Sequence, residues 1–247
     1  MTNWPRWTGQ LLGASLMAWA ACAAAAEPVR QTRDISQPFS EVRLVGGLDL
    51  ELTQGDTVSL VIEATPEDLS HIRSDVSDGV LTLRREDSEL LNFSKWFSRH
   101  PAPRALLSAK AIDRMAVAGS GSIHAAAWSS DALRARIAGS GNLKFDRLTA
   151  ARFTCEIAGS GDALVAGSVT NQKVQIAGSG QYRAPDLRSQ TASVSISGSG
   201  SAELWAERTL DVRIAGSGDV GYHGTPAVTR SVSGSGRVTG LGATGAP

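Results

Sequence analysis

Seven serines of this chain share a spacing that could serve either catalysis or binding, because each lies between two glycines. Successive Gly-Ser-Gly units follow one another at steps of 20, 20, 19, 20, 18 and 18 residues. A serine nucleophile needs one unique position beside a histidine and an acid, and the Gly-x-Ser-x-Gly elbow is a different motif. The repeated serines therefore predict a row of hydroxyls, a candidate contact strip made of Ser120, Ser140, Ser160, Ser179, Ser199, Ser217 and Ser235.

Carboxylate pairs would indicate a different chemistry, the cleavage of polysaccharides. Asp162 and Asp219 both follow Gly-Ser-Gly units, but three repeats separate them. If repeats stack like neighbouring strands, at about 4.8 Å each, these acids lie roughly 15 Å apart. Glycosidase pairs use separations of about 5 to 9.5 Å. A carbohydrate-active enzyme is the alternative hypothesis, and it requires a cleft that joins Glu156 with Asp162 or Glu203 with Glu207.

The other reactive residue types predict no catalytic residue, no metal and no cofactor. Cys155 lies in an alternating run between Phe153 and Ile157, which favours a buried, inert thiol. An Asp follows only some of the Gly-Ser-Gly units, which argues against a repeated calcium site. The histidines lack the paired spacing of zinc ligands and are interpreted as surface residues: His71, His100, His124 and His223.

An aromatic-rich stretch at residues 90–97 provides a candidate contact loop with Phe93, Trp96 and Phe97. Two interpretations stay open for these side chains. They either pack between two parts of the chain or insert into a partner or membrane surface.

Charge and composition exclude other function classes. The 247 residues carry 24 Lys or Arg and 24 Asp or Glu, so the chain lacks the basic field of a nucleic-acid-binding protein. With 42% hydrophobic but only 5% aromatic residues, and 26 glycines, the chain predicts a core of small and β-branched side chains.

Residues 1–26 have the pattern of a signal peptide, with Arg6 before an apolar stretch and Ala24-Ala25-Ala26 before Glu27. The apolar stretch is shorter than the roughly 20 residues of a membrane-spanning helix. We therefore expect an exported protein, periplasmic or in the outer envelope or extracellular space, without a transmembrane span in the mature chain. Lipidation at Cys22 is the alternative, although Trp19 occupies a position where lipoprotein signals usually carry an aliphatic residue.

Each repeat alternates between apolar and polar residues with a period of two, as in Leu133, Ala135 and Ile137 against Arg134 and Arg136. This period predicts strands. A unit of about 20 residues cannot bury its apolar face alone, so units stack as coils of a β-solenoid. We predict an all-β fold in which residues 111–241 form a β-helix-like solenoid of about seven coils of 18–20 residues, with residues 242–247 as a tail.

Residues 27–110 are less regular and predict an N-terminal β-segment with an aromatic connector. A degenerate repeat surrounds Gly46-Gly47, and Pro66 opens a short helical turn. The segment is either a small β-domain or a set of irregular first coils that caps the solenoid. A cap is expected because an open coil edge invites polymerisation.

The glycines beside each serine have inward parity in the alternating pattern, which predicts a bend or a close approach of the opposite wall. Two orientations of the serines stay open. If the alternation continues through the unit, the hydroxyls point outward. If a glycine adopts a positive φ, the hydroxyls can instead point inward and bond to a neighbouring coil.

The repeated turns, written Ile/Val-Ala/Ser-Gly-Ser-Gly-Asp/Asn, together with the closing stretch 216–238 and its Gly-x-Pro step, resemble the head-GIN domain family of auto-transporter adhesins. The resemblance covers about residues 35–241. It implies a right-handed parallel β-helix-like fold in bacterial envelope proteins.

The leading hypothesis for function is an exported envelope protein that acts as an adhesin-like binding or structural module without catalytic activity. Its expected partners are a cell-envelope glycan or protein, with homo-oligomerisation as a further option. No nucleic-acid partner is expected.

Overall fold

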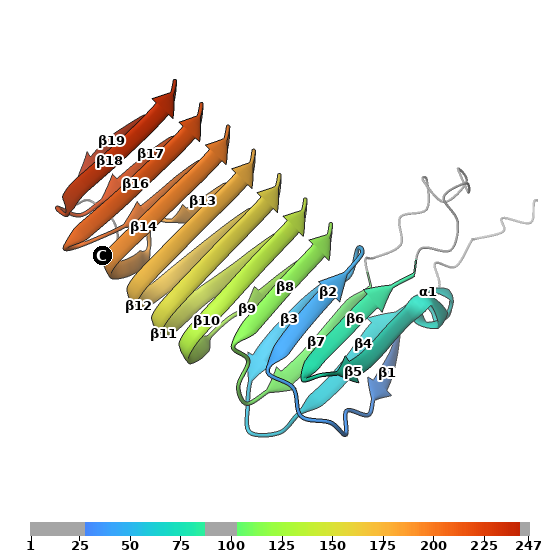
Figure 1. Ribbon diagram of the computed structural model, residues 1–247. Helices are drawn as coiled ribbons and strands as arrows, with labels where there is room; N and C mark the ends of the chain where they lie inside the picture. The colour runs from blue at the N-terminus through green and yellow to red at the C-terminus, as the bar shows by residue number, and fades with distance from the viewer. Residues whose placement is uncertain (1–27, 87–102, 243–247) are drawn as a thin grey trace, which may run out of the picture.

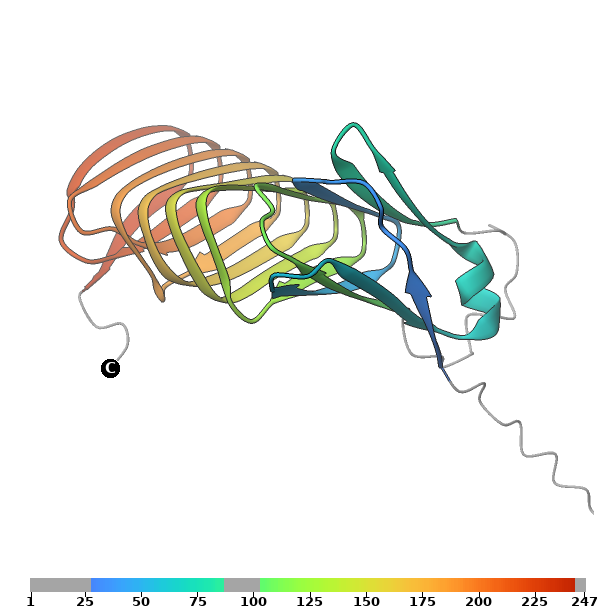
Figure 2. The ribbon, with the colours of Figure 1, turned by 90° about the horizontal axis from the view of Figure 1, so that it is seen from below.

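The computed structural model describes residues 28–86 and 103–242. Within these ranges the chain forms 19 strands and one short helix, and all strands belong to a single sheet. The sheet winds into a stack of coils that forms a rod, with an irregular end near the N-terminus (Figures 1 and 2). The predicted all-β solenoid is confirmed.

Wall A of the rod carries the residues that lead into each Gly-Ser-Gly unit, and its neighbouring strands are parallel and in register. It contains β2 (Glu41–Val45), β6 (Val80–Arg85), β8 (Arg114–Gly119), β16 (Thr209–Gly216) and β18 (Ala227–Gly234). It also contains the last residues of four longer strands, β10 (Trp128–Gly139), β11 (Asn142–Gly159), β12 (Asp162–Gly178) and β14 (Leu187–Gly198).

Wall B carries the residues that follow each unit. It contains the first residues of β11 and β12 together with β3 (Asp49–Gln54), β7 (Arg104–Ala109), β9 (Ser122–Ala125), β13 (Gln181–Ala184), β15 (Ser201–Trp205), β17 (Asp219–His223) and β19 (Arg237–Gly242). A shorter wall C connects wall B back to wall A, through residues 128–130, 148–150, 167–169 and 187–189.

Inward-facing residues of successive coils stack in columns that fill the rod. One column on wall A, which we call the Cys155 column, runs through Val42, Met115, Ala135, Cys155, Val174, Val194 and Val212. Each of these side chains is at most 2% exposed. Burial raises the pKa of the Cys155 thiol to about 12, so the predicted inert thiol is confirmed.

The glycines of each unit differ from each other, which corrects the expectation that both face inward. The first glycine has a positive φ, between +120° and +130° across the seven units, and is at least partly exposed. The second is buried in all units but the last. A Cβ on Gly178 would lie 2.4 Å from the carbonyl oxygen of Gly159, and one on Gly180 would lie 2.6 Å from that of Gly161. Both positions therefore require glycine, for backbone conformation and for close approach of the next coil.

The N-terminal strands join the same sheet as the repeats. β2 and β3 form the first coil, which lies between the β6–β7 pair and the β8–β9 pair, although β6 and β7 follow it in sequence. The stack ends in antiparallel strands: β1 (Val29–Arg33) and β7 flank β4 (Ser59–Ala64), and β5 (Ile72–Ser77) pairs with β6. Residues 29–85 thus close this end of the rod.

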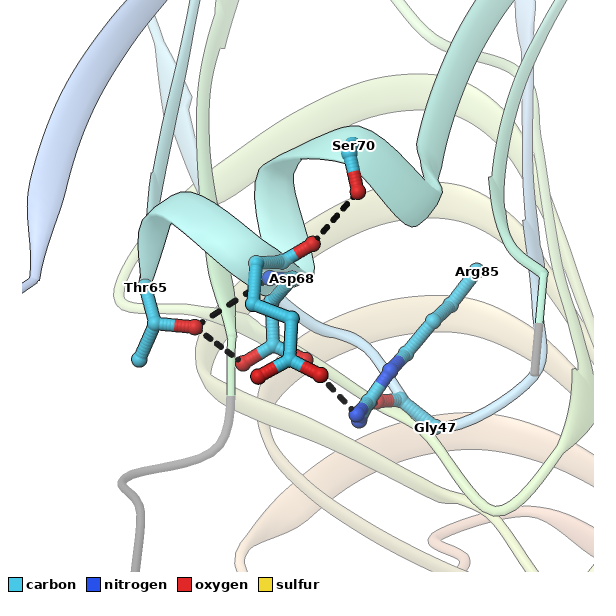
Figure 3. Close-up of polar contacts among 6 residues, drawn as sticks. Gly47, Thr65, Asp68, Ser70 and Arg85 are labelled. Atoms are coloured by element: carbon cyan, nitrogen blue, oxygen red, sulfur yellow. Dashed lines mark hydrogen bonds and ion pairs between the residues drawn. The ribbon is translucent and has the colours of Figure 1, made fainter. Parts of the chain in front are cut away.

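Helix α1 (Pro66–His71) covers the closed end and is fixed to the first coil (Figure 3). Thr65 caps the helix by accepting a hydrogen bond from the Asp68 amide at 3.1 Å. Arg85 forms an ion pair with Asp68 at 2.9 Å and donates a longer hydrogen bond, 3.4 Å, to the carbonyl oxygen of Gly47. The degenerate Gly46-Gly47 repeat is therefore the point where the cap meets the coils.

Candidate functional site

The seven serines lie on the outside of the rod, one per coil, and all are exposed. From Ser140 onward, their backbone amides donate to the carbonyl oxygen of the first glycine of the preceding coil, as from Ser140 to Gly119 at 3.0 Å and from Ser179 to Gly159 at 2.9 Å. The positive φ of the first glycine in each unit does not turn the hydroxyl of the following serine inward, so the outward orientation is the one observed. We call this row the Ser strip, and its members are Ser120, Ser140, Ser160, Ser179, Ser199, Ser217 and Ser235.

A shallow groove runs beside the Ser strip on the outer face of wall A, with a volume of about 280 Å³. One side carries polar side chains that include Arg136, Glu156 and Gln175, and the other side carries small residues such as Ala177 and Ser197. We call it the strip groove. Its lining is Arg136, Glu156, Ile157, Ala158, Gln175, Ile176, Ala177, Ser195 and Ser197.

The carboxylate pairs of the enzyme hypothesis do not meet in the grooves that hold their members. Glu156 lines the strip groove, where it lies 3.9 Å from Arg134, and Asp162 is not part of that lining. On wall B, Oε1 of Glu203 lies at hydrogen-bond distance, 2.9 Å, from Nε2 of His223. Glu207 lines a different groove on wall C.

His124, like His223, forms contacts with carboxylates that the sequence did not reveal. His124 lies between two carboxylates of neighbouring coils, with Nδ1 2.9 Å from Glu51 and Nε2 2.8 Å from Asp146. Hydrogen bonds from Lys144 and His124 lower the pKa of the Asp146 carboxyl. Across the described ranges, no group of three or more His, Cys, Asp or Glu side chains is arranged to hold a metal ion.

A polar network lies inside the rod, where only apolar residues were expected. Gln172 occupies an inward position between Phe153 and Ala192 and is 2% exposed. Its amide donates to the Ser189 hydroxyl and to the Trp205 carbonyl, both at 2.8 Å, and its oxygen accepts from Tyr182 at 3.0 Å. A single polar residue at an inward repeat position was the available signal for this network.

Several predictions fall outside the described residues: the candidate loop with Phe93, Trp96 and Phe97, the segment 1–26 with Cys22, and the tail after Gly242. The short α1 is the one helix in the described ranges, and none there has the length and hydropathy to cross a bilayer.

A family model described as "Putative auto-transporter adhesin, head GIN domain" matches residues 38–226. The chain belongs to this family. A comparison with curated protein sequences finds no match.

Solved structures of three other bacterial proteins share the fold. A "putative adhesin" from Bacteroides fragilis is 21% identical with a TM-score of 0.76, over 87% of this chain and 97% of that one. A "putative lipid binding protein" from Parabacteroides distasonis is 24% identical with a TM-score of 0.67, over 87% and 97%. A "putative adhesin" from Parabacteroides merdae is 20% identical with a TM-score of 0.67, over 87% and 96%.

Proposed function

We propose that this head-GIN protein is an exported, adhesin-like module of the cell envelope that binds an extended glycan along the Ser strip, without catalysis. The observation that carries the proposal is the regular, rigid row of exposed hydroxyls. The backbone amides of the six serines from Ser140 to Ser235 bond to the preceding coil, so holding these positions costs little conformational entropy when a ligand binds. Neighbouring strands lie about 4.8 Å apart, and the hydroxyls therefore recur along the rod at a short, constant interval.

The strip groove adds the polar groups that saccharide recognition uses. Arg136 can donate to sugar hydroxyls, Glu156 can accept from them, and Gln175 can do both. The small side chains of Ala177 and Ser197 leave room for a sugar ring against the sheet. Because the groove follows the stack of coils, we expect a linear polymer to lie parallel to the rod axis.

A test of this function is a binding array of glycan and peptidoglycan fragments on the full chain. Ser179→Arg places a long cation in the middle of the strip and should abolish binding of at least one fragment that the wild type retains. Thr53→Arg is the matched control, because Thr53 is exposed on β3, away from the strip. The proposal is wrong if the array shows no binding, or if Ser179→Arg binds every fragment as well as wild type.

Absence of catalysis is a separate part of the proposal. Any glycan that binds should be recovered intact, with no new reducing ends after long incubation. Release of reducing ends that Glu156→Ala or Glu207→Ala abolishes would instead favour the carbohydrate-active enzyme.

A second candidate function, binding of an anionic lipid, is favoured by a groove at the closed end. Val29, Leu69 and Ile72 supply apolar surface and Arg30 and Arg73 supply positive charge around a volume of about 470 Å³. An acyl chain with an acidic head group fits this combination. Binding of laurate that Leu69→Asp abolishes would support it, and failure of laurate to bind would exclude it.

A further inference from the structure

A second groove lies on the outer face of wall C, on a different side of the rod from the strip groove. Its volume is about 440 Å³, within the usual range for small-ligand sites. Exposed side chains, all polar except Ala151, line it and alternate along the strands with Ala150, Val169 and Ser189, which are buried. We call it the Arg188 groove, after one of its bordering residues: Thr149, Ser168, Thr170, Arg188, Gln190 and Glu207.

The guanidinium of Arg188 is held in place from below by an aromatic platform. Its Cζ lies 4.7 Å from the centroid of the Trp205 ring, a favourable cation–π geometry. Trp205 also stacks on His223, with centroids 5.8 Å apart and planes at 13°. His223 is in turn fixed by Glu203 at 2.9 Å. Three planar groups from three successive coils therefore fix the orientation of one exposed cation.

The polar network inside the rod supports the same platform. Gln172 and Ser189 both donate to the carbonyl oxygen of Trp205, at 2.8 and 2.6 Å. Burying polar groups in an otherwise apolar core is costly unless they are satisfied, and here the bonds converge on the residue beneath Arg188. Such local departures from an apolar repeat are expected where a site must be held rigidly.

Further polar atoms are buried around the platform. Nε1 of Trp205 and Nδ1 of His223 are both buried without a hydrogen-bond partner among the described atoms. The repeat also changes here, because the step between Gly198 and Gly216 shortens from 20 to 18 residues. Regular packing of the coils alone requires neither the stacked side chains of Arg188, Trp205 and His223 nor the buried polar atoms around them.

We infer that the Arg188 groove is a second, separate saccharide site, in which Arg188 donates to vicinal hydroxyls and Glu207 accepts from them. The sugar packs against the exposed Ala151, and the hydroxyls of Thr149, Ser168 and Thr170 bind its edge. The inference takes its ligand class from the proposed function but uses none of the Ser strip. With sites on two walls, one rod can hold two glycan chains at once.

The experiment measures binding of cello-, chito- and galacturono-oligosaccharides to the full chain by calorimetry. Arg188→Ala should weaken binding at this groove by about tenfold or more. Arg188→Lys should weaken it nearly as much, because an ammonium lacks the planar fork that stacks on Trp205. Arg208→Ala is the matched control, an exposed neighbouring arginine outside the groove lining. Melting curves confirm that each variant folds.

Ser179→Arg separates this inference from the proposed function. A saccharide that binds to Ser179→Arg but not to Arg188→Ala occupies the Arg188 groove. The inference is overturned if none of the oligosaccharides binds, or if Arg188→Ala and Arg188→Lys bind every one of them as tightly as wild type. Loss of all binding in Ser179→Arg alone would leave the Ser strip as the saccharide site.

Discussion

The two ends of the rod are terminated in different ways. At the N-terminal end, the antiparallel strands β1, β4 and β5 and the helix α1 cover the first coils. At the other end, the last strands β18 and β19 each pair with one described strand only, β16 and β17. One end is closed by added structure, while at the other end the described residues finish on the strands of the last coil.

We expect Arg230 to block further stacking at this end. It occupies the next inward position of the Cys155 column, directly after Val212, which is fully buried. All seven preceding members of the column are apolar, and Arg230 is exposed. An inward-pointing charge on an edge strand prevents another strand from docking, since docking would bury the charge. The comparison teaches that one substitution in a repeat can terminate a solenoid that otherwise needs a whole cap.

The largest expected effect concerns the coils between the ends. Gly180→Val introduces a Cβ 2.6 Å from both the Gly161 carbonyl oxygen and Cγ2 of Ile157. Backbone must shift to relieve this overlap, so we expect a loss of about 3 kcal/mol or more in the free energy of unfolding. Urea denaturation measures the loss. Ser179→Ala, at the exposed position next to it, is the control, and an unchanged midpoint for Gly180→Val would contradict the close packing of the coils.

The next effect concerns the open end. Arg230→Val extends the apolar Cys155 column to the surface and leaves β18 free to pair with a second copy. We expect concentration-dependent dimers or longer species by size-exclusion chromatography with light scattering. Arg230→Lys keeps the charge and should behave as wild type. If Arg230→Val is monomeric at every concentration, another feature terminates the rod.

A smaller effect is expected at the closed end. Arg85→Ala removes the ion pair with Asp68 and the hydrogen bond to Gly47, which together hold α1 on the first coil. The pair is partly buried, so we expect a loss of about 1 kcal/mol and faster amide exchange in residues 66–71. Arg84→Ala, at an exposed position on the same strand, is the control. Equal exchange in both variants would show that α1 is held by other contacts.

The smallest effect is the pH dependence of the His124 contacts near the closed end. The pKa of Asp146 is lowered from 3.8 by Lys144 and His124. The contribution of the ionised Asp146 carboxyl to stability is therefore complete above its pKa in the unfolded chain. This contribution is lost as the pH falls through the lower pKa of the folded state. Asp146→Asn should flatten the stability profile in that acidic range, and an identical profile would show that the exposed pair contributes nothing measurable.

The repeat could be predicted from the sequence because period and spacing are local properties. Alternation around Ile137 and the spacing of the glycines were sufficient for the solenoid. The orientation of Ser140 was not, since it depends on the φ of Gly139 and on the bond to Gly119, which join different coils. For the same reason the sequence could not place β2 and β3 between later strands.

The exceptions inside the repeat were readable only once the register was known. Gln172 and Arg230 look like ordinary polar residues of a strand in the sequence. The register places them in columns of apolar neighbours, where one supports the Arg188 groove and the other ends the rod. A candidate site thus became visible through the residues that break the pattern.

The matched corners of successive coils also have an evolutionary consequence. Because Gly159 stacks on Gly139 and most residues of neighbouring coils pair in register, we expect that a whole coil can be duplicated or deleted as a genetic unit without disturbing either terminus. The length of the rod then changes between related proteins in steps of one coil. A lineage can change the length of the Ser strip by gene recombination, without any new side chain.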